Sequence, residues 1–137
     1  MASRTAYPQT RLTSRIIGVY FEVYNELGAG FVESVYQAAL AVALGHAGIA
    51  AAREVAFPVF FRGTRVGEFR ADLLVEDSVL LELKAVPRLA EAHRAQLLNY
   101  LRASGVEVGL LLNFVPQPTI RRLVRCGAYA GVRTSDS

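Results

Sequence analysis

The chain has 137 residues, of which 53% are hydrophobic and 20% are charged, and it carries a formal net charge of +3 at pH 7. This length favours one domain with one hydrophobic core, and the single cysteine, Cys126, excludes an intrachain disulfide and a cysteine-based zinc site. No apolar stretch reaches the length of a membrane span and the first residues lack the apolar core of a signal peptide, so we expect a cytoplasmic protein without a membrane partner.

The first part of the chain predicts two helices. Apolar residues recur at helical spacing over residues 12–27, and Gly28 is placed to end that helix. A second helix is expected over residues 31–46, with Val32 and Val35 among the residues on its inner side. Both patterns are typical of helices that turn one apolar face toward a core.

The rest of the chain is dominated by predicted strands. Three strands joined by short turns are expected at residues 54–61, 65–76 and 79–86. A helix is expected over 89–102, and the nearly continuous apolar run at 106–115 predicts a buried central strand. Residues 119–126 are ambiguous between a short strand and a helix. This order predicts an α/β fold with a mixed sheet, in which a helical crossover adds a strand to antiparallel hairpins.

These elements fit a single domain. No internal repeat and no linker divides the chain. We therefore expect one domain over residues 12–129, preceded by an N-terminal arm at 1–11 and followed by a flexible tail at 130–137.

The chain has only one lysine, Lys84. Fifteen residues are Lys or Arg, so the other fourteen are Arg. Arginine stays protonated in proteins, whereas the pKa of a lysine falls readily on burial. A lone Lys84 next but one to Glu82, in an apolar run, therefore suggests chemistry that a guanidinium cannot perform. The excess of arginine has two explanations, the base composition of the source genome or a selected basic face that contacts a polyanion.

Two carboxylates and this lysine are predicted to meet on the sheet. Glu82 and Lys84 project from the same face of their strand, because side chains alternate along it. The hairpin would bring Asp72 beside Glu82, and two carboxylates so close repel each other unless a cation lies between them. Carboxylate oxygens and the backbone carbonyl of Leu83 suit Mg²⁺. The alternative is a structural salt-bridge cluster, in which Lys84 pairs with Glu82 and Arg70 pairs with Asp72.

Polar residues on two predicted helices are further candidates. Glu33 and Tyr36 share a helix face, so Glu33 would complete the carboxylate cluster, although the helix dipole alone also favours a Glu there. Gln96 and Tyr100 lie four residues apart and would present an amide and a phenol to a ligand, or would mark the polar boundary of a packed helix. Asn113 lies in a predicted core strand and has a structural explanation.

Five blocks, in this order, carry a resemblance to a known family. They are Gly30–Tyr36 (G-x-x-E-x-x-Y), Asp72, Glu82–Lys84, Gln96–Tyr100 and Gly109–Phe114. Over residues 12–126 the chain resembles the GxxExxY protein family of the PD-(D/E)xK nuclease-like superfamily. The resemblance implies a restriction-endonuclease-like αβββαβ core with a mixed central sheet flanked by helices. The chain departs from the family pattern at Tyr24, where a His is common, and at Ala71, where a Pro is common.

The resemblance also implies a site and a function. The implied catalytic residues are Asp72, Glu82 and Lys84. The implied ligands of Mg²⁺, or of Mn²⁺ in its place, are Glu33, Asp72, Glu82 and the Leu83 carbonyl. The implied substrate-binding residues are Gln96 and Tyr100, to which we add Tyr36 and Arg94. We therefore predict a metal-dependent nuclease that hydrolyses phosphodiester bonds of nucleic acid, with DNA the expected substrate.

Two other functions remain open at this point. One is a non-catalytic nucleic-acid-binding accessory module with the same fold. The other is a protein-interaction domain whose ionic cluster is structural. Exonuclease or endonuclease action, sequence preference and assembly as a homodimer are also left open by the sequence.

Overall fold

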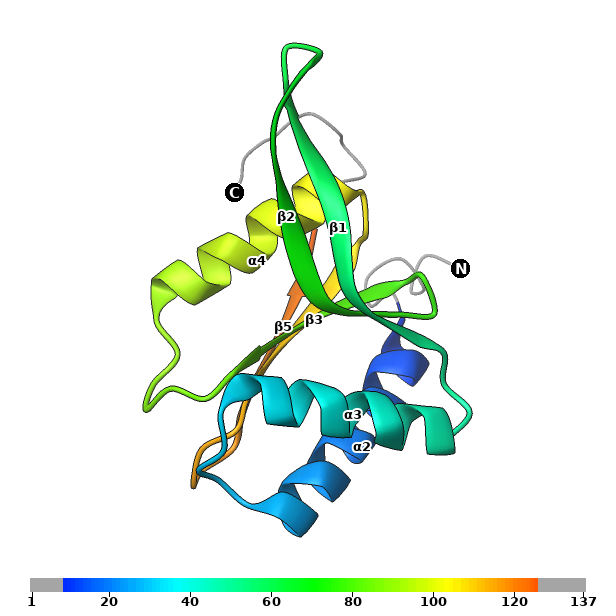
Figure 1. Cartoon of the computed structure of the whole chain (residues 1–137), viewed down its shortest axis with the longest axis vertical. Coiled ribbons are helices and arrows are strands. Elements are labelled where there is room, and N and C mark those ends of the chain that lie inside the picture. The colour runs from blue at the N-terminus through cyan, green and yellow to red at the C-terminus, as the bar shows by residue number, and fades with distance from the viewer. Residues whose placement is uncertain (1–8, 126–137) are drawn as a thin grey trace.

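The fold is a five-stranded sheet with helices on both faces (Figure 1). The computed structural model describes residues 9–125. The helices are α2 (Thr10–Leu27), α3 (Glu33–His46) and α4 (Glu91–Ser104). The strands are β1 (Ala51–Phe61), β2 (Thr64–Val75), β3 (Val79–Lys84), β4 (Val108–Asn113) and β5 (Thr119–Val124). None of the helices in the described residues is long and apolar enough to cross a membrane.

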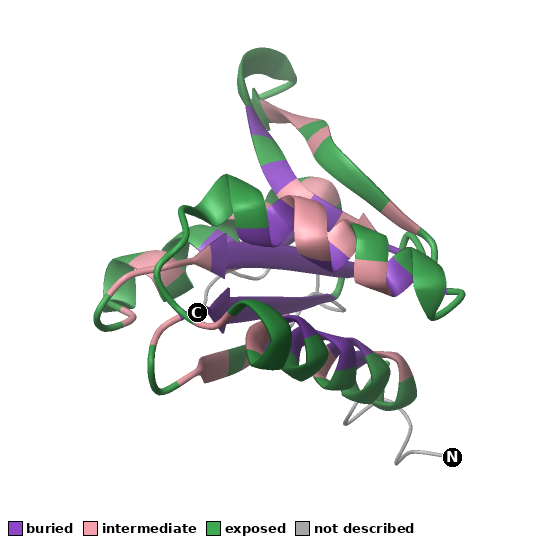
Figure 2. Cartoon of the chain, turned by 60° about the horizontal axis from the view of Figure 1, so that its bottom comes forward, coloured by how far each residue is buried: buried purple, intermediate pink, exposed green. Residues whose placement is uncertain are grey.

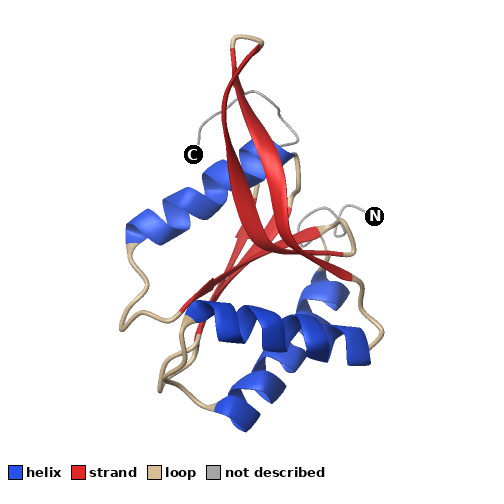
Figure 3. Cartoon of the chain, viewed as in Figure 1, coloured by secondary structure: helices blue, strands red, loops and turns tan. Residues whose placement is uncertain are grey.

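The strands, which are red in Figure 3, form one sheet. Their order in the sheet is the sequence order, β1-β2-β3-β4-β5. Neighbouring strands are antiparallel except β3 and β4, which are parallel. A parallel pair needs a crossover connection, and α4 provides it. The predicted α/β fold with a mixed sheet is therefore confirmed. β4 is buried along its whole length, as expected for a central strand (Figure 2).

Two apolar clusters lie on opposite faces of the sheet. One joins α2 and α3 to the sheet and includes Ile16, Leu40 and Leu81. The other joins α4 to the sheet and includes Leu80 and Leu97. Side chains of β3 alternate between these clusters, so the Leu80 side of β3 is the side on which Glu82 and Lys84 follow.

The element boundaries differ from those predicted at several ends. Helix α2 begins at Thr10, inside the segment expected to be an arm, and β1 begins at Ala51 instead of residue 54. The ambiguous segment after residue 118 forms strand β5, which pairs with β4 in antiparallel register. Residues 1–8 and 126–137, which include the predicted tail at 130–137, lie outside the described part of the chain.

The predicted inner face of α3 is confirmed at Tyr36 and Leu40 and is wrong at Val32 and Val35. Val32 and Val35 are 66% and 38% exposed. Val32 precedes the helix with extended backbone, and the core-facing stripe follows the four-residue spacing of Tyr36, Leu40 and Leu44. This rotation brings Gln37 inward, toward the acidic residues of the sheet.

Gly109 on β4 allows α4 to lie close to the sheet. A Cβ at this position would lie 3.0 Å from Cδ1 of the buried Leu97. We therefore expect Gly109→Val to lower the free energy of unfolding by about 1–3 kcal/mol through overpacking. The control is Gly67→Val, because Gly67 lies in β2 with no atom within 4 Å of an added Cβ. Urea denaturation measures both variants, and equal midpoints would contradict the expectation.

Candidate active site

Strands β2 and β3 separate at the position of the two predicted carboxylates. Their antiparallel pairing extends only as far as Leu73 opposite Leu81. At the next position, the Asp72 amide donates to Glu82 Oε2 at 3.1 Å, and the Leu83 amide donates to Asp72 Oδ2 at 2.8 Å. Each carboxylate therefore replaces a backbone acceptor where the strands part. The structure brings Asp72 and Glu82 together, as the hairpin predicted.

Both carboxyl groups have raised pKa values. The Glu82 side chain is buried, and burial, followed by the negative charge of Asp72, raises the pKa of Glu82 to about 8. Burial also raises the pKa of Asp72, against the opposing effects of the Leu83 hydrogen bond and of Lys84. The positive charge of Lys84 does not offset burial and the charge of the neighbouring acid, and a bound cation would favour the ionised form of both carboxyl groups.

Lys84 follows Glu82 on the same face of β3 and is half-buried. Its positive charge lowers the pKa of both acids. Among residues 9–125, Lys84 forms no ion pair within 4 Å, and Arg70 pairs with Glu68 at 3.7 Å. The salt-bridge cluster that we considered as an alternative is therefore not formed.

Glu33 lies near the Asp72–Glu82 pair but does not exchange hydrogen bonds with it. It is the first residue of α3, and its Oε2 accepts a hydrogen bond of 3.3 Å from the Ala85 amide just after β3. Its negative charge contributes to the raised pKa values of Asp72 and Glu82. Within residues 9–125, however, no three acidic, His or Cys side chains gather closely enough to form a metal centre on their own. The tightly arranged part of the site is the Asp72–Glu82 pair.

The chemistry of this pair fits Mg²⁺. The ion prefers oxygen ligands, and it usually keeps several waters and takes one or two carboxylates from a protein. Asp72 and Glu82 are two such carboxylates, and in the described part of the chain only one oxygen of Glu82 accepts a hydrogen bond. Each acid also accepts a hydrogen bond from a backbone amide of the other strand, so both candidate metal ligands are held in place before any ion binds.

Three residues that the sequence did not reveal, Gln37, Arg53 and Glu54, form a hydrogen-bonded group that reaches Asp72 through Gln37. Gln37 is 6% exposed, and its Nε2 donates to Glu54 Oε2 at 2.8 Å and to Asp72 Oδ1 at 3.4 Å. Arg53 Nε donates to Gln37 Oε1 at 3.1 Å and so fixes which way the amide faces. Gln37 lies one helical turn after Glu33, which is the sequence pattern that would have predicted its position.

Glu54 lies opposite Asp72 in the β1–β2 register, between the pairs Arg53–Leu73 and Val55–Ala71. Its φ is +53°, a left-handed conformation that is uncommon for any residue other than glycine. Glu54 also raises the pKa of Asp72. It is therefore an acidic neighbour of the pair, held by Gln37.

The predicted substrate residues of α4 differ in burial. Tyr100 is half-buried and stacks on Phe69 with ring centroids 3.9 Å apart. Burial, and then the negative charges of Glu82 and Asp72, raise the pKa of Tyr100, which shows that its phenol lies in the electrostatic field of the acids. Gln96, one turn earlier on α4, is exposed.

Arg94 and Tyr36 have other surroundings. Arg94 is exposed and pairs with Glu91 at 3.1 Å on the same helix. Tyr36 is fully buried, and its hydroxyl donates to the Gly28 carbonyl at 2.5 Å and accepts from the Phe31 amide at 3.2 Å. A side chain with no exposed atom cannot contact a substrate, so Tyr36 fixes the start of α3 instead.

Asn113 has the structural role considered from the sequence. Its Oδ1 accepts from the Val86 amide at 3.0 Å, and its Nδ2 donates to the Val86 carbonyl at 2.9 Å. Its own backbone carbonyl accepts from the Tyr20 hydroxyl at 2.6 Å. These bonds fix the chain just beyond the end of β3, close to Lys84.

A surface depression of about 510 Å³ lies beyond the ends of β3 and β4. Arg88 and Arg121 contribute to its lining, but neither acid of the pair and not Lys84 does. The depression is therefore lined in part by residues that follow Lys84 closely in the sequence, but it does not include the candidate active site.

Comparisons with known proteins agree with this geometry. A family model described as the PD-(D/E)XK nuclease superfamily matches residues 10–123. A solved structure titled "Crystal structure of SSO0001" is similar in fold, with a TM-score of 0.55, 22% identity, and coverage of 67% of this chain and 49% of that chain. The chain thus spans about half the length of that protein, and no curated protein matches it. With its acids at the predicted strand positions and a family match over most of its length, the chain belongs to the PD-(D/E)XK nuclease superfamily.

Proposed function

We propose that this protein is a Mg²⁺-dependent nuclease that hydrolyses phosphodiester bonds of nucleic acid, with DNA the expected substrate and Mn²⁺ able to replace Mg²⁺. The observation that carries this proposal is the Asp72–Glu82 pair, in which two acids with raised pKa values exchange backbone hydrogen bonds beside Lys84. Membership of the GxxExxY family, which rests on the sequence blocks, belongs to the same proposal.

The residues of the candidate active site would have separate tasks. Asp72 and Glu82 would hold the ion, with Glu33 and the Leu83 carbonyl as further ligands. A bound Mg²⁺ polarises a phosphoryl oxygen and lowers the pKa of a coordinated water. Lys84 would orient or deprotonate the attacking water, and its positive charge would stabilise the negative charge that develops on the phosphate.

Residues on α4 would hold the substrate strand. Tyr100 is fixed by its stacking on Phe69, and its phenol is within the field of the two acids. Gln96 is exposed on the same helix and would contact the strand through its amide. Arg94 is exposed and would exchange its partner Glu91 for a phosphate, so that affinity falls as salt rises.

Direct cleavage tests the proposal. Labelled single- and double-stranded DNA and RNA are incubated with the protein in Mg²⁺, Mn²⁺ or EDTA. We expect cleavage with either metal and none in EDTA, and we expect Lys84→Ala to cut about a hundredfold more slowly. Arg15→Ala is the control, because it removes a positive charge whose bond is to the Ala47 carbonyl at the α2–α3 layer. No cleavage by the wild type, or equal cleavage by Lys84→Ala, would reject the proposal.

A second function is favoured by one observation. Among the described residues, no third acidic, His or Cys side chain lies close enough to the pair to complete a metal centre. A nucleic-acid-binding module that has lost catalysis would have this arrangement. Salt-dependent binding of nucleic acid without turnover in any metal would identify it.

A further inference from the structure

Strands β1 and β2 extend beyond the rest of the sheet as a two-stranded arm, residues 55–71 (Figure 1). Strand β3 pairs only with residues 73–75 of β2, so no third strand accompanies the arm. The base of the arm is nevertheless fixed, because Phe69 stacks on Phe57 and on Tyr100 of α4. The arm therefore has a defined direction relative to the candidate active site.

The tip of the arm exposes large apolar side chains. Phe60, Phe61 and Val66 are 60%, 59% and 60% exposed. The guanidinium of Arg62 lies 5.0 Å from the centroid of the Phe61 ring. Exposed aromatic rings beside arginine form the kind of surface on which unpaired bases stack.

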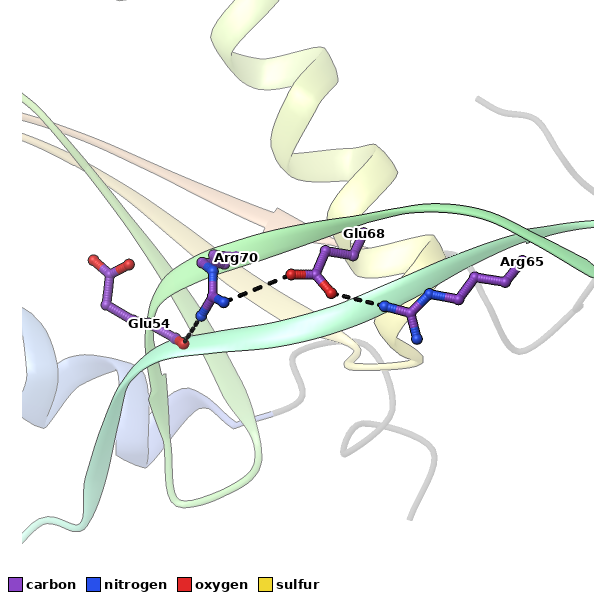
Figure 4. A network of polar contacts seen from close by, with 4 residues as sticks. All are labelled: Glu54, Arg65, Glu68 and Arg70. Carbon is purple, nitrogen blue, oxygen red and sulfur yellow. Dashed lines mark hydrogen bonds and ion pairs between the residues drawn. The ribbon is translucent and has the colours of Figure 1, made fainter.

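The arm also carries most of the net charge of the chain. Residues 55–71 contain three Arg and one Glu, a net charge of +2, compared with +3 for the whole sequence. The single acid, Glu68, lies between Arg65 at 2.7 Å and Arg70 at 3.7 Å, so its charge is compensated (Figure 4). A second copy of the same arm would be repelled by this charge, whereas a phosphate backbone would be attracted.

We propose that the tip of the arm binds a single-stranded segment of nucleic acid, with Phe60 and Phe61 stacking on bases and Arg62 contacting phosphate. The proposal rests on the proposed function, because the arm and the catalytic acids would bind one substrate. Phe61 at the end of β1 pairs with Thr64 at the start of β2, and Thr64 lies eight residues from Asp72 on that strand. At about 3.3 Å per residue, the tip reaches roughly 26 Å from the acids. Substrates with an unpaired region at that distance from the cut would be preferred.

Binding without cleavage tests this proposal. Fluorescence anisotropy measures the dissociation constant of a labelled single strand of about 30 nucleotides, in EDTA, with the full chain. We expect the double variant Phe60→Ala/Phe61→Ala to bind at least about tenfold more weakly, since each stacked base contributes about 1–3 kcal/mol. Binding of a blunt duplex of the same length should change about threefold or less. Phe21→Ala is the control, because Phe21 is an exposed aromatic residue on α2.

Three results would overturn the proposal. The first is wild-type protein that does not bind the single strand, and the second is a double variant that binds it as tightly as the wild type. The third is a wild-type dimer that becomes a monomer in the double variant by sedimentation, which would make a second copy the partner of the tip. Because EDTA prevents metal-dependent cutting, loss of binding in the double variant supports the arm even if the wild type cuts nothing. If the double variant cuts and binds as the wild type does, the proposal for the arm is rejected and the proposed nuclease function is not.

Discussion

Replacing Asp72 with Asn is expected to abolish metal-dependent cleavage and to leave the fold intact. Asparagine keeps an oxygen that accepts the Leu83 amide, so the local hydrogen bond survives. It removes the negative charge that would bind the cation, and we expect the cleavage rate to fall by about a thousandfold. Stability without metal should not fall, because burial and neighbouring acids disfavour the charge of Asp72.

Thermal unfolding gives a second measurement on the same variant. A ligand that binds only the folded state stabilises it, by about 2.7 kcal/mol at a hundred times its dissociation constant. Mg²⁺ should therefore raise the melting temperature of the wild type and leave that of Asp72→Asn unchanged. A Mg²⁺-dependent shift of equal size in both proteins would remove Asp72 from the metal site.

Glu54→Gln is the matched control for Asp72→Asn. Both acids accept from the same amide of Gln37 and lie opposite each other in the β1–β2 register. Glu54, however, does not belong to the pair that exchanges backbone hydrogen bonds. Its substitution should leave cleavage within about tenfold of the wild type and retain the Mg²⁺ shift. A loss as large as that of Asp72→Asn would make Glu54 a ligand.

The central geometry of the site could be predicted from the sequence because it follows from local rules. A short turn fixes the register of the hairpin, and strand alternation fixes the face of each side chain. Together these rules placed Asp72 beside Glu82, with Lys84 on the same face, and the structure has this arrangement. The buried strand β4 and the crossover helix were predictable for the same reason, from continuous apolar content and helical spacing.

Features that depend on contacts between elements could not be predicted in this way. The rotation of α3 about its axis is set by Tyr36 and Leu40 entering the core, and this rotation buries Gln37 and exposes Val35. The separation of β2 from β3 at Asp72 has no marker in the hydrophobic pattern. The left-handed conformation of Glu54 likewise requires knowledge of its neighbours Gln37 and Arg70.

The affinity for Mg²⁺ is expected to rise with pH up to about 8. Burial and the charge of Asp72 raise the pKa of Glu82 to about 8, so at neutral pH this group is mostly protonated without metal. An ion binds the carboxylate, so binding releases the proton, and the apparent dissociation constant should fall about tenfold per pH unit below the pKa. Isothermal titration across that range measures this slope, and Glu82→Gln should bind weakly at every pH.

Without metal, the free energy of unfolding is expected to fall as pH rises, whereas the affinity for Mg²⁺ rises. The folded pKa of Glu82 lies above its ordinary value of 4.5, so between 4.5 and about 8 the folded state holds more protons than the unfolded state. The contribution of Glu82 to the free energy of unfolding is therefore complete below pH 4.5. It is lost as pH rises to about 8, by at most about 1.4 kcal/mol per pH unit. The raised pKa of Asp72 acts in the same direction. Because a bound cation favours the ionised acids, the Mg²⁺-dependent increase in melting temperature should grow from about pH 6 to about pH 8. An increase that is equal at both pH values, or larger at the lower one, would show that Glu82 does not hold the ion.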